Sequence, residues 1–367
     1  MDASLLHRDL YSPTRIGGIA VNNRVVMAPL TRLRADKRGI VSDMTGLYYA
    51  QRASAGLIVS EAIAVSPWAH GYAWTPGIYR DDQIKAWNRV VRVVHRNGGR
   101  IVAQLWHGGR IAHPSLMPHH DRPLAPSAIR PAGHAHTYHG NQDFVTPRAL
   151  KTREVPRIVA EFAHAAEAAM EAGFDGVEIH AANGYLIDQF LRDKSNKRID
   201  AYGGSIAARC KFALDVTEAV CNMIGPDYVG VRISPLNVFN DVSDRHPRVL
   251  FRYLVSALSD LNISYLHVIE DVPHQDIEAE TAFNLDELRP LFHGAYMVNG
   301  GYDARRAEVS IESGRADFVS FGRAYIANPD LVERFIAHAP LEEPEQSLYY
   351  AGGAHGYIDY PAMDARH

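Results

Sequence analysis

The chain has 367 residues, of which 47% are hydrophobic and 22% charged, a composition typical of a globular protein with an ordinary core. Lys and Arg number 38 against 42 Asp and Glu without long runs of either sign, which argues against a non-specific nucleic-acid surface. No apolar stretch has the length of a membrane span, and the first residues do not resemble a secretory signal. Two cysteines, Cys210 and Cys221, are too few for a disulfide framework, so we expect a cytoplasmic protein.

Short apolar runs alternate with segments of helical periodicity from residue 25 to residue 338. Near-continuous Val, Ile and Leu indicate strands that are buried on both faces, as in a parallel sheet. The predicted strands are 24–30, 57–63, 100–106, 176–180, 229–234, 265–270, 295–300 and 318–323. The helices predicted between them include 43–55, 82–97, 154–172, 206–223 and 303–313.

Eight strand–helix units in succession predict an α/β fold, a closed (βα)8 TIM barrel, rather than an open sheet. A barrel can accommodate this length, so we expect residues 1–367 to form a single domain. After the third strand, residues 107–153 form a long loop rich in Pro, Gly and His. Loops of this length are usually functional, and we expect a capping subdomain over the C-terminal mouth of the barrel. We expect the aromatic tail from about 340 to 367 to fold back onto the same mouth.

Two kinds of signal mark helix ends. Asn328-Pro329-Asp330 predicts an N-cap at Asn328 with Pro329 in the first helical position. Gly98-Gly99 and Gly173 stand at predicted helix exits, where a left-handed residue is usually needed.

Polar side chains gather at the predicted C-terminal ends of the strands, where βα barrels carry their active sites. Polar groups within apolar strands cost free energy unless they are paired, so this group indicates a ligand. Its members are Thr31, Glu61, Gln104, Trp106, His180 and Arg232.

The last two strand–helix loops have features of a phosphate site. Gly300 and Gly301 precede a helix predicted to open at Asp303, and Gly322-Arg323 follows the last strand. Glycine allows close backbone approach, a helix N-terminus favours an anion, and Arg323 adds a positive charge. A phosphate site and an ordinary loop both fit this pattern.

The segment 180–191, HAANGYLIDQFL, places His180, Asn183 and Tyr185 close together. If the chain turns helically after the strand, His180 and Asn183 share one face and can donate to a single oxygen. Tyr185 would then supply a proton nearby. A buried His–Asn hydrogen bond with Tyr185 in the core is the alternative.

Seven motifs, in order and in register, resemble those of the old yellow enzyme family. They are MAPLTR (27–32), SEA (60–62), QLWHGGR (104–110), HAANGY (180–185), SNKRIDAYGGS (195–205), VRISP (231–235) and FGRAYIANPDLVERF (321–335). At position 31 this chain has threonine, so it resembles the branch of the family with threonine at this position rather than the branch with cysteine near the flavin. Asn183 stands where some bacterial members have a second His.

This resemblance implies an FMN-binding barrel. Thr31 would hydrogen-bond near the flavin O4, Gln104 would pair with the pyrimidine edge, and Arg232 would face N1 and O2. A cation at that position stabilises reduced flavin. The main chain of Pro29, Leu30 and Ala62 would touch the ring. The phosphate would be held by Gly300, Gly301, Gly322 and Arg323.

The resemblance also implies an ene-reductase. Hydride would pass from NADPH or NADH through N5 of FMN to the β-carbon of an activated alkene, an enone, maleimide or nitroalkene. His180 and Asn183 would bind the substrate oxygen and Tyr185 would protonate the α-carbon. Reduction of nitro groups or nitrate esters would use the same oxygen clamp. Tyr72, Trp106 and Tyr350 would line the substrate pocket, with Asn240 at its edge.

Several alternatives remain at this point. A dienoyl-CoA reductase would add an iron–sulfur cluster and another domain, and we expect neither. A Schiff-base aldolase needs a lysine in a strand, and the predicted strands contain none. A non-catalytic or sensory flavin-binding barrel could discard the clamp and the phenol. We expect a monomer or homodimer, no nucleic-acid or membrane partner, and no metal, although six histidines occur in the long loop: His113, His119, His120, His134, His136 and His139.

Overall fold

The computed structural model describes residues 9–270 and 282–363. Eight parallel strands close into a barrel in the order β10-β11-β12-β13-β14-β3-β4-β5, which confirms the predicted TIM barrel. All eight predicted strands are present. Their bounds are β3 (Val25–Met27), β4 (Leu57–Ala64), β5 (Ile101–Trp106), β10 (Gly176–Ala181), β11 (Val229–Ile233), β12 (Tyr265–Ile269), β13 (Ala295–Asn299) and β14 (Phe318–Phe321).

β3 and β14 end more than one residue before their predicted ends, in both cases on the side that faces the mouth. β3 ends at Met27, and the main chain continues through Pro29, which has no N–H for a strand ladder. β14 ends at Phe321, where Gly322 leaves the strand conformation and a helix begins at Arg323. The segments that follow β3 and β14 lie outside the strands, so their backbone is available to contact a ligand.

Helices surround the barrel, and the five named in the prediction are all present. Those α-helices are α1 (Asp43–Ala50), α2 (Asp81–Arg96), α3 (Val155–Glu171), α5 (Ile206–Ile224) and α7 (Ala304–Glu312), and the others are α4 (Leu186–Leu191), α6 (Pro247–Asp260), α8 (Arg323–Ala327) and α9 (Leu331–Ile336). Gly98 and Gly173 have φ of 79° and 93° just beyond α2 and α3, as expected for left-handed helix exits. Gly99 is not left-handed. Within the described ranges, no helix combines the length and the apolar character that crossing a membrane requires.

The predicted helix start at Asn328 was wrong. The residue before α9 is Asp330, and Asn328 instead closes α8 by donating from Nδ2 to the carbonyl oxygen of Ala324 at 2.8 Å. The Oδ1 of Asn328 accepts the backbone N–H of Glu342 at 2.8 Å. Its side chain is thus used to hold the C-terminal tail, a long-range contact that local spacing does not reveal.

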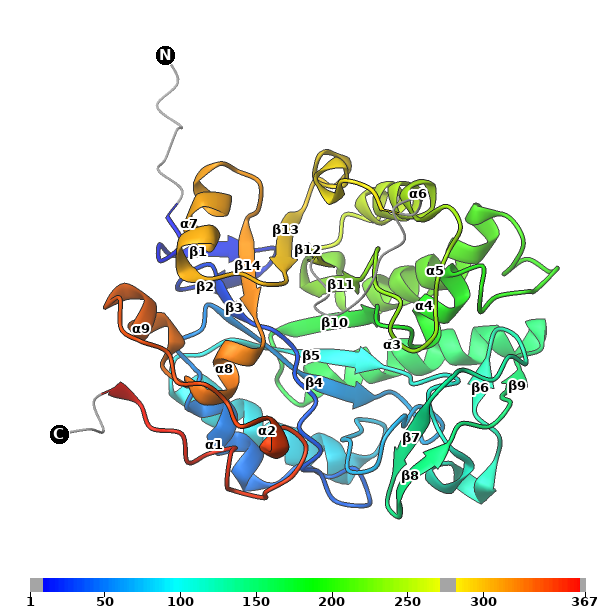
Figure 1. Cartoon of the computed structure of the whole chain (residues 1–367), viewed down its shortest axis with the longest axis horizontal. Helices are drawn as coiled ribbons and strands as arrows, with labels where there is room; N and C mark the ends of the chain where they lie inside the picture. The colour runs from blue at the N-terminus through cyan, green and yellow to red at the C-terminus, as the bar shows by residue number, and fades with distance from the viewer. Residues whose placement is uncertain (1–8, 271–281, 364–367) are drawn as a thin grey trace.

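The barrel is closed at one end and polar at the other. A hairpin of β1 (Thr14–Ile16) and β2 (Ile19–Val21) covers the end where the strands begin. Ile16, Ile19 and Val21 pack there against Val26 and Val102 from the barrel interior. Figure 1 shows this hairpin on the opposite side of the barrel from the β7–β8 hairpin described next. Among the described residues this hairpin covers the end where the strands begin, so the access for a ligand lies at the carboxyl ends of the strands.

The segment 107–153 has small elements of its own. β6 (Leu124–Ala125) pairs in parallel with β9 (Arg148–Ala149), and β7 (His134–Thr137) pairs antiparallel with β8 (Gly140–Asp143). Short 3-10 helices flank them at Pro114–Leu116, Pro118–His120 and Thr152–Glu154. The β7–β8 hairpin lies beyond the ends of β4 and β5 (Figure 1). The backbone N–H of Ala73 donates to the carbonyl oxygen of His136 at 3.0 Å, which ties the hairpin to the loop after β4.

The tail returns to the mouth, as predicted, over the residues that are described. The guanidinium of the buried Arg32 donates to the carbonyl oxygens of Tyr349 at 2.9 Å and Gly356 at 2.7 Å. Tyr357 stacks on Tyr48 with ring centroids 4.1 Å apart. Residues 364–367 lie outside the described range.

Candidate active site

Two adjoining cavities open at the carboxyl end of the barrel, each of about 580 Å³. Pro29, Leu30, Arg323 and Tyr349 line both, so the cavities meet along the segment after β3. The first contains the glycine loops after β13 and β14. The second is largely aromatic and contains Tyr72, His136, Tyr185, Phe239 and Tyr350. The first therefore suits an anionic group and the second an apolar one.

The glycine loops form one wall of the first cavity. Gly300 and Gly301 have φ of 128° and 61°, conformations that favour glycine. A Cβ at Gly322 would meet only Leu30, at 3.5 Å, so a side chain there would occupy the cavity that both residues line. The side chain of Asp303 accepts from the N–H of Arg306 at 2.7 Å and caps α7, as predicted. Arg323 supplies the nearby positive charge.

Gln104 and Arg232 lie below the mouth, inside the barrel. The Nε2 of Gln104 donates to Oε1 of Glu178 at 2.8 Å, which leaves its carbonyl oxygen and one hydrogen for a ligand. Nη2 of Arg232 donates to Oδ1 of Asn299 at 3.0 Å. The Nε of Arg232 is buried and has no partner among the described residues. Buried unpaired donors are costly, so both side chains have the free polar capacity that a bound ligand would use.

A buried carboxylate–imidazole pair, Glu178 and His267, supports these two side chains, and the sequence analysis did not identify it. Nδ1 of His267 lies 2.8 Å from Oε2 of Glu178, and its Nε2 lies 2.7 Å from Oγ of Ser320. Burial alone would raise the pKa of Glu178, but His267 and Arg232 hold that pKa below its usual range. The sequence contains a signal for this pair, because Glu178 and His267 are polar residues inside apolar strands.

Tyr185 lines the second cavity, and His180 contacts Tyr185 from outside that lining. Their ring centroids are 5.0 Å apart in an edge arrangement. Burial, and then the charge of Arg232, lower the pKa of His180 to about 3, so the imidazole is neutral at physiological pH. Its Nδ1 is buried and has no partner among the described residues. Burial, with Tyr72 beside it, raises the pKa of Tyr185 well above the usual value, so the phenol keeps its proton.

The chain does not turn helically after β10, so the helical turn that would put His180 and Asn183 on one face is not present. Asn183 and Gly184 have φ of 58° and 74°, and α4 begins only at Leu186. This left-handed turn is held by contacts with the loop after β11, where Ser234 Oγ accepts the N–H of Asn183 at 2.8 Å. Oδ1 of Asn183 accepts from Asn237 at 2.6 Å. The alternative of a buried His180–Asn183 hydrogen bond is not what the structure shows.

The predicted site residues fall into two groups. The cavity linings include Pro29, Leu30, Thr31, Tyr72, Tyr185, Arg232, Gly300, Gly301, Gly322, Arg323 and Tyr350. Ala62, Gln104, Trp106, His180 and Asn183 lie outside the linings. Trp106 is buried behind Tyr72, with ring centroids 5.8 Å apart, and packs edge-on against Tyr185 at 5.2 Å. Ala62 pairs with Gln104 in the β4–β5 ladder.

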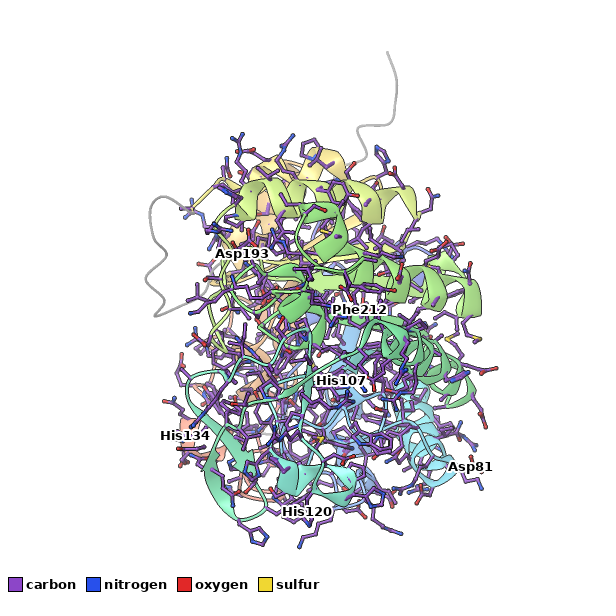
Figure 2. The ribbon with its side chains drawn as sticks, turned by 90° about the vertical axis from the view of Figure 1, so that its right-hand side faces the viewer. Asp81, His107, His120, His134, Asp193 and Phe212 are labelled. Carbon is purple, nitrogen blue, oxygen red and sulfur yellow. The ribbon has the colours of Figure 1, made fainter. Side chains whose placement is uncertain are left out.

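Sequence reasoning did not identify His136, Phe239 and Tyr349 as cavity residues. All three come from loops or the tail, where no periodic pattern indicates which side chains meet the mouth. The other loop histidines do not gather. Figure 2 shows His120 and His134 at the edge of the molecule and His107 within it. No three His, Cys, Asp or Glu side chains come together as a possible metal site in the described part of the chain.

The amino-acid sequence matches the model of a known protein family. The model of the NADH:flavin oxidoreductase / NADH oxidase family covers residues 9–342. The chain belongs to this family. It is an old yellow enzyme family member and an FMN-dependent, NAD(P)H-dependent oxidoreductase, as the motifs predicted.

The relatives span the whole chain. A probable flavin mononucleotide-dependent alkene reductase of Leishmania infantum is 42% identical over 359 residues, 96% of this chain and 97% of that protein. A 12-oxophytodienoate reductase 2 of Arabidopsis thaliana is 40% identical over 363 residues, 97% and 96% of the two chains. The solved structure of morphinone reductase is 42% identical with a TM-score of 0.94, covering 99% of each chain.

The site fits the FMN that this old yellow enzyme family uses. The first cavity offers glycine backbone and Arg323 for a phosphate, while Gln104 and the unpartnered Nε of Arg232 offer donors for a polar ring edge. Flavin sites need this combination of a phosphate-binding loop and groups that tune the ring. The second cavity then remains for the molecule that is reduced.

Proposed function

We propose that this enzyme reduces the carbon–carbon double bond of a small alkene activated by a carbonyl, imide or nitro group. The observation that carries the proposal is a neutral imidazole with an unpartnered buried nitrogen, His180, beside a protonated phenol, Tyr185. Tyr185 offers a proton at the wall of the aromatic cavity, and His180 beside it offers an oxygen-binding donor. The Leishmania infantum relative is named as a probable alkene reductase, which supports the same class.

The residues that would hold FMN follow from their placement. Gly300, Gly301, Gly322 and Arg323 would bind the phosphate, and Pro29 and Leu30 would contact the ring. Thr31, Gln104, Arg232 and the main chain of Ala62 would complete the contacts predicted from the family. When bound, FMN supplies the hydride transfer from NADH or NADPH to the β-carbon of the alkene.

His180 and Asn183 would bind the substrate oxygen. Negative charge develops on this oxygen as the double bond is reduced, and donors aimed at it stabilise the transition state. A neutral His180 can donate one N–H without adding a charge. The amide of Asn183 can supply the second donor through Nδ2.

Tyr185 would protonate the α-carbon. Its pKa lies far above neutral because it is buried beside Tyr72, so the acid form is fully populated. Tyr72, Trp106 and Tyr350 would shape the aromatic pocket around the substrate, and His136 brings the segment 107–153 to the same pocket. This placement supports a capping role for that segment within a single domain.

The proposal is tested by steady-state reduction of 2-cyclohexenone with NADPH or NADH. Wild-type protein should be yellow and should consume the enone, and the two nicotinamides compared would give the preferred donor. Substitution of His180 by Ala should lower the enone rate by about 10²–10³-fold, the usual cost of one such donor. Near-normal turnover of this variant would remove His180 from the clamp, and a colourless protein that binds no FMN would end the proposal.

A further inference from the structure

The loop after β11 carries an asparagine that no role assigned so far uses. Asn237 is buried, with 3% of its surface exposed, and its two amide atoms are both engaged. Its Nδ2 donates to Oδ1 of Asn183 at 2.6 Å, and its Oδ1 accepts the backbone N–H of Phe239 at 2.7 Å.

The backbone N–H of Phe239 fixes which amide atoms of Asn237 and Asn183 are oxygen and which are nitrogen. The N–H of Phe239 can only donate, so the atom of Asn237 that faces it must be the oxygen. The nitrogen of Asn237 therefore faces Asn183, and the atom of Asn183 that receives it must also be an oxygen. The planar amide of Asn183 then turns its Nδ2 away from Asn237. Among the described residues, this Nδ2 donates to no protein acceptor.

The remaining polar groups of Asn183 are fixed in the same way. Its N–H donates to Oγ of Ser234 at 2.8 Å, and its carbonyl oxygen accepts from Nδ2 of Asn240 at 2.8 Å. The left-handed backbone of Asn183 is thus held on both sides by one loop. Only the Nδ2 hydrogens are left for a ligand.

Two arginines make that loop rigid. Arg192, paired with Asp188 at 2.7 Å, donates to the carbonyl oxygens of Ser234 at 2.6 Å and Pro235 at 3.0 Å. Arg110 donates to the carbonyl oxygens of Asn240 at 3.2 Å and Asp241 at 2.6 Å. Asn237 lies between these two anchored ends, so its side chain has a defined place from which to act on Asn183.

We propose that Asn237 is a positioning residue that locks the amide of Asn183 with its N–H donors toward the substrate oxygen, an inference that rests on the clamp of the proposed function. An unlocked amide could present either its oxygen or its nitrogen to the substrate. With the oxygen presented, the lone pairs of the amide and of the substrate would repel each other, and one donor of the clamp would be lost.

The test exploits the opposite hydrogen-bonding preference of a carboxylate. In Asn237→Asp, the ionised side chain can only accept, so Asn183 must rotate to donate to it and must turn its own oxygen toward the substrate. The protonated side chain can donate and restores the original orientation. The charged or titratable groups that contact this loop include Arg192 with Asp188, Arg110 and Lys194 with Asp241, and Arg209 with Asp244. Tyr72 and Tyr185 face it at Asn240, with His180 beside Tyr185. All of these groups are unchanged in the variant.

We expect kcat/KM of the FMN-loaded variant for 2-cyclohexenone to approach wild type at low pH. It should fall by about 10²-fold as the carboxyl ionises across a scan from about pH 5 to pH 9. Flavin reduction by NADPH should not change. The carbonyl stretching frequency of isotope-labelled 2-cyclohexenone, bound to oxidised enzyme without nicotinamide, should lose part of its hydrogen-bond shift over the same range.

Two further variants test whether the pH dependence arises from the hydrogen bonds of Asn237. Asn237→Leu removes both hydrogen bonds without a charge and should lower kcat/KM for the enone by about tenfold at every pH, the effect of losing one ordinary hydrogen bond. Asn88→Asp is the matched control, because Asn88 is half-buried between α2 and α3, where it donates to the carbonyl oxygen of Ala172 at 3.1 Å. It should match wild type throughout.

Asn237→Asp and Asn237→Leu that both match wild type in enone kinetics and carbonyl frequency would overturn the inference. A loss shared equally with flavin reduction would also overturn it, since that result indicates general disruption. If the wild type reduces no activated alkene, the proposed function itself has failed, which separates the two.

Discussion

The phenol oxygens of Tyr185 and Tyr72 lie 3.0 Å apart at the wall of the aromatic cavity. One hydroxyl must donate to the other, and both keep their protons at neutral pH. Burial raises the pKa of Tyr72 to about 12, and burial, with Tyr72 beside it, raises the pKa of Tyr185 well above its usual value. A proton that Tyr185 gives away can therefore be replaced from Tyr72.

Replacing Tyr185 by Phe should slow enone reduction by about 10²–10⁴-fold, the usual contribution of a positioned proton donor. Flavin reduction by NADPH should stay within about twofold of wild type, because Tyr185 has no proton to give in that half-reaction. Stopped-flow measurement of the two half-reactions checks this. As a comparison, Tyr72→Phe should cost less, since Tyr185 retains its own proton. Equal slowing of both half-reactions in Tyr185→Phe would refute the assignment.

Arg323 should discriminate FMN from riboflavin. It lines the cavity with the glycine loops, so its charge should act on the phosphate rather than on the ring. Substitution by Gln should raise the dissociation constant of FMN by about 10–100-fold, the effect of one charge-assisted hydrogen bond. Titration of apoprotein with both flavins measures this, and riboflavin affinity should be unchanged. Parallel weakening of both flavins would place Arg323 elsewhere.

Tyr350 should affect substrate binding but not stability. It lines the aromatic cavity and yet is 59% exposed, so it contributes little to the core. Substitution by Ala should raise KM for 2-cyclohexenone by about twofold to tenfold, the range of one aromatic contact. The thermal midpoint should not move. Unchanged enone kinetics together with a lower midpoint would show that Tyr350 is structural.

Buried neutral histidines should make the protein sensitive to acid. Burial lowers the pKa of His107 from 6.5 to about 3, of His180 to about 3 and of His70 to about 4. Below about pH 6.5 these histidines bind protons in the unfolded chain but stay neutral in the folded chain. The unfolding free energy therefore falls as pH falls toward about 4. Each histidine contributes at most about 1.4 kcal/mol for each pH unit in this window.

The variant His107→Asn isolates one of these contributions. Asn can still accept the N–H of Gly109, which His107 receives at Nδ1 at 3.0 Å, but it does not titrate. Urea unfolding from pH 7 to about pH 4.5 should show a shallower decline in stability than wild type. A slope identical to wild type would show that His107 is protonated in the folded protein or shielded in the unfolded one.

The apolar runs and their spacing were enough to predict the barrel, its eight strands and the polar residues at their ends. Strands such as Leu57–Ala64 and Gly176–Ala181 are buried on both faces, so their apolar runs and the glycines between elements record the fold locally. Motif order added the family and the flavin. The strands and helices can be predicted from the sequence because each depends on residues that are close together in the chain.

The contacts that support the site could not be predicted, because they join residues far apart in the chain. The Glu178–His267 pair joins residues 89 positions apart, and the Asn237–Asn183 bond joins residues 54 apart. His136 reaches the aromatic cavity from a hairpin with no periodic pattern, and Asn183 takes a left-handed turn rather than a helical one. Such contacts arise when the barrel closes and brings successive loops to one mouth, a relationship that local propensity does not contain.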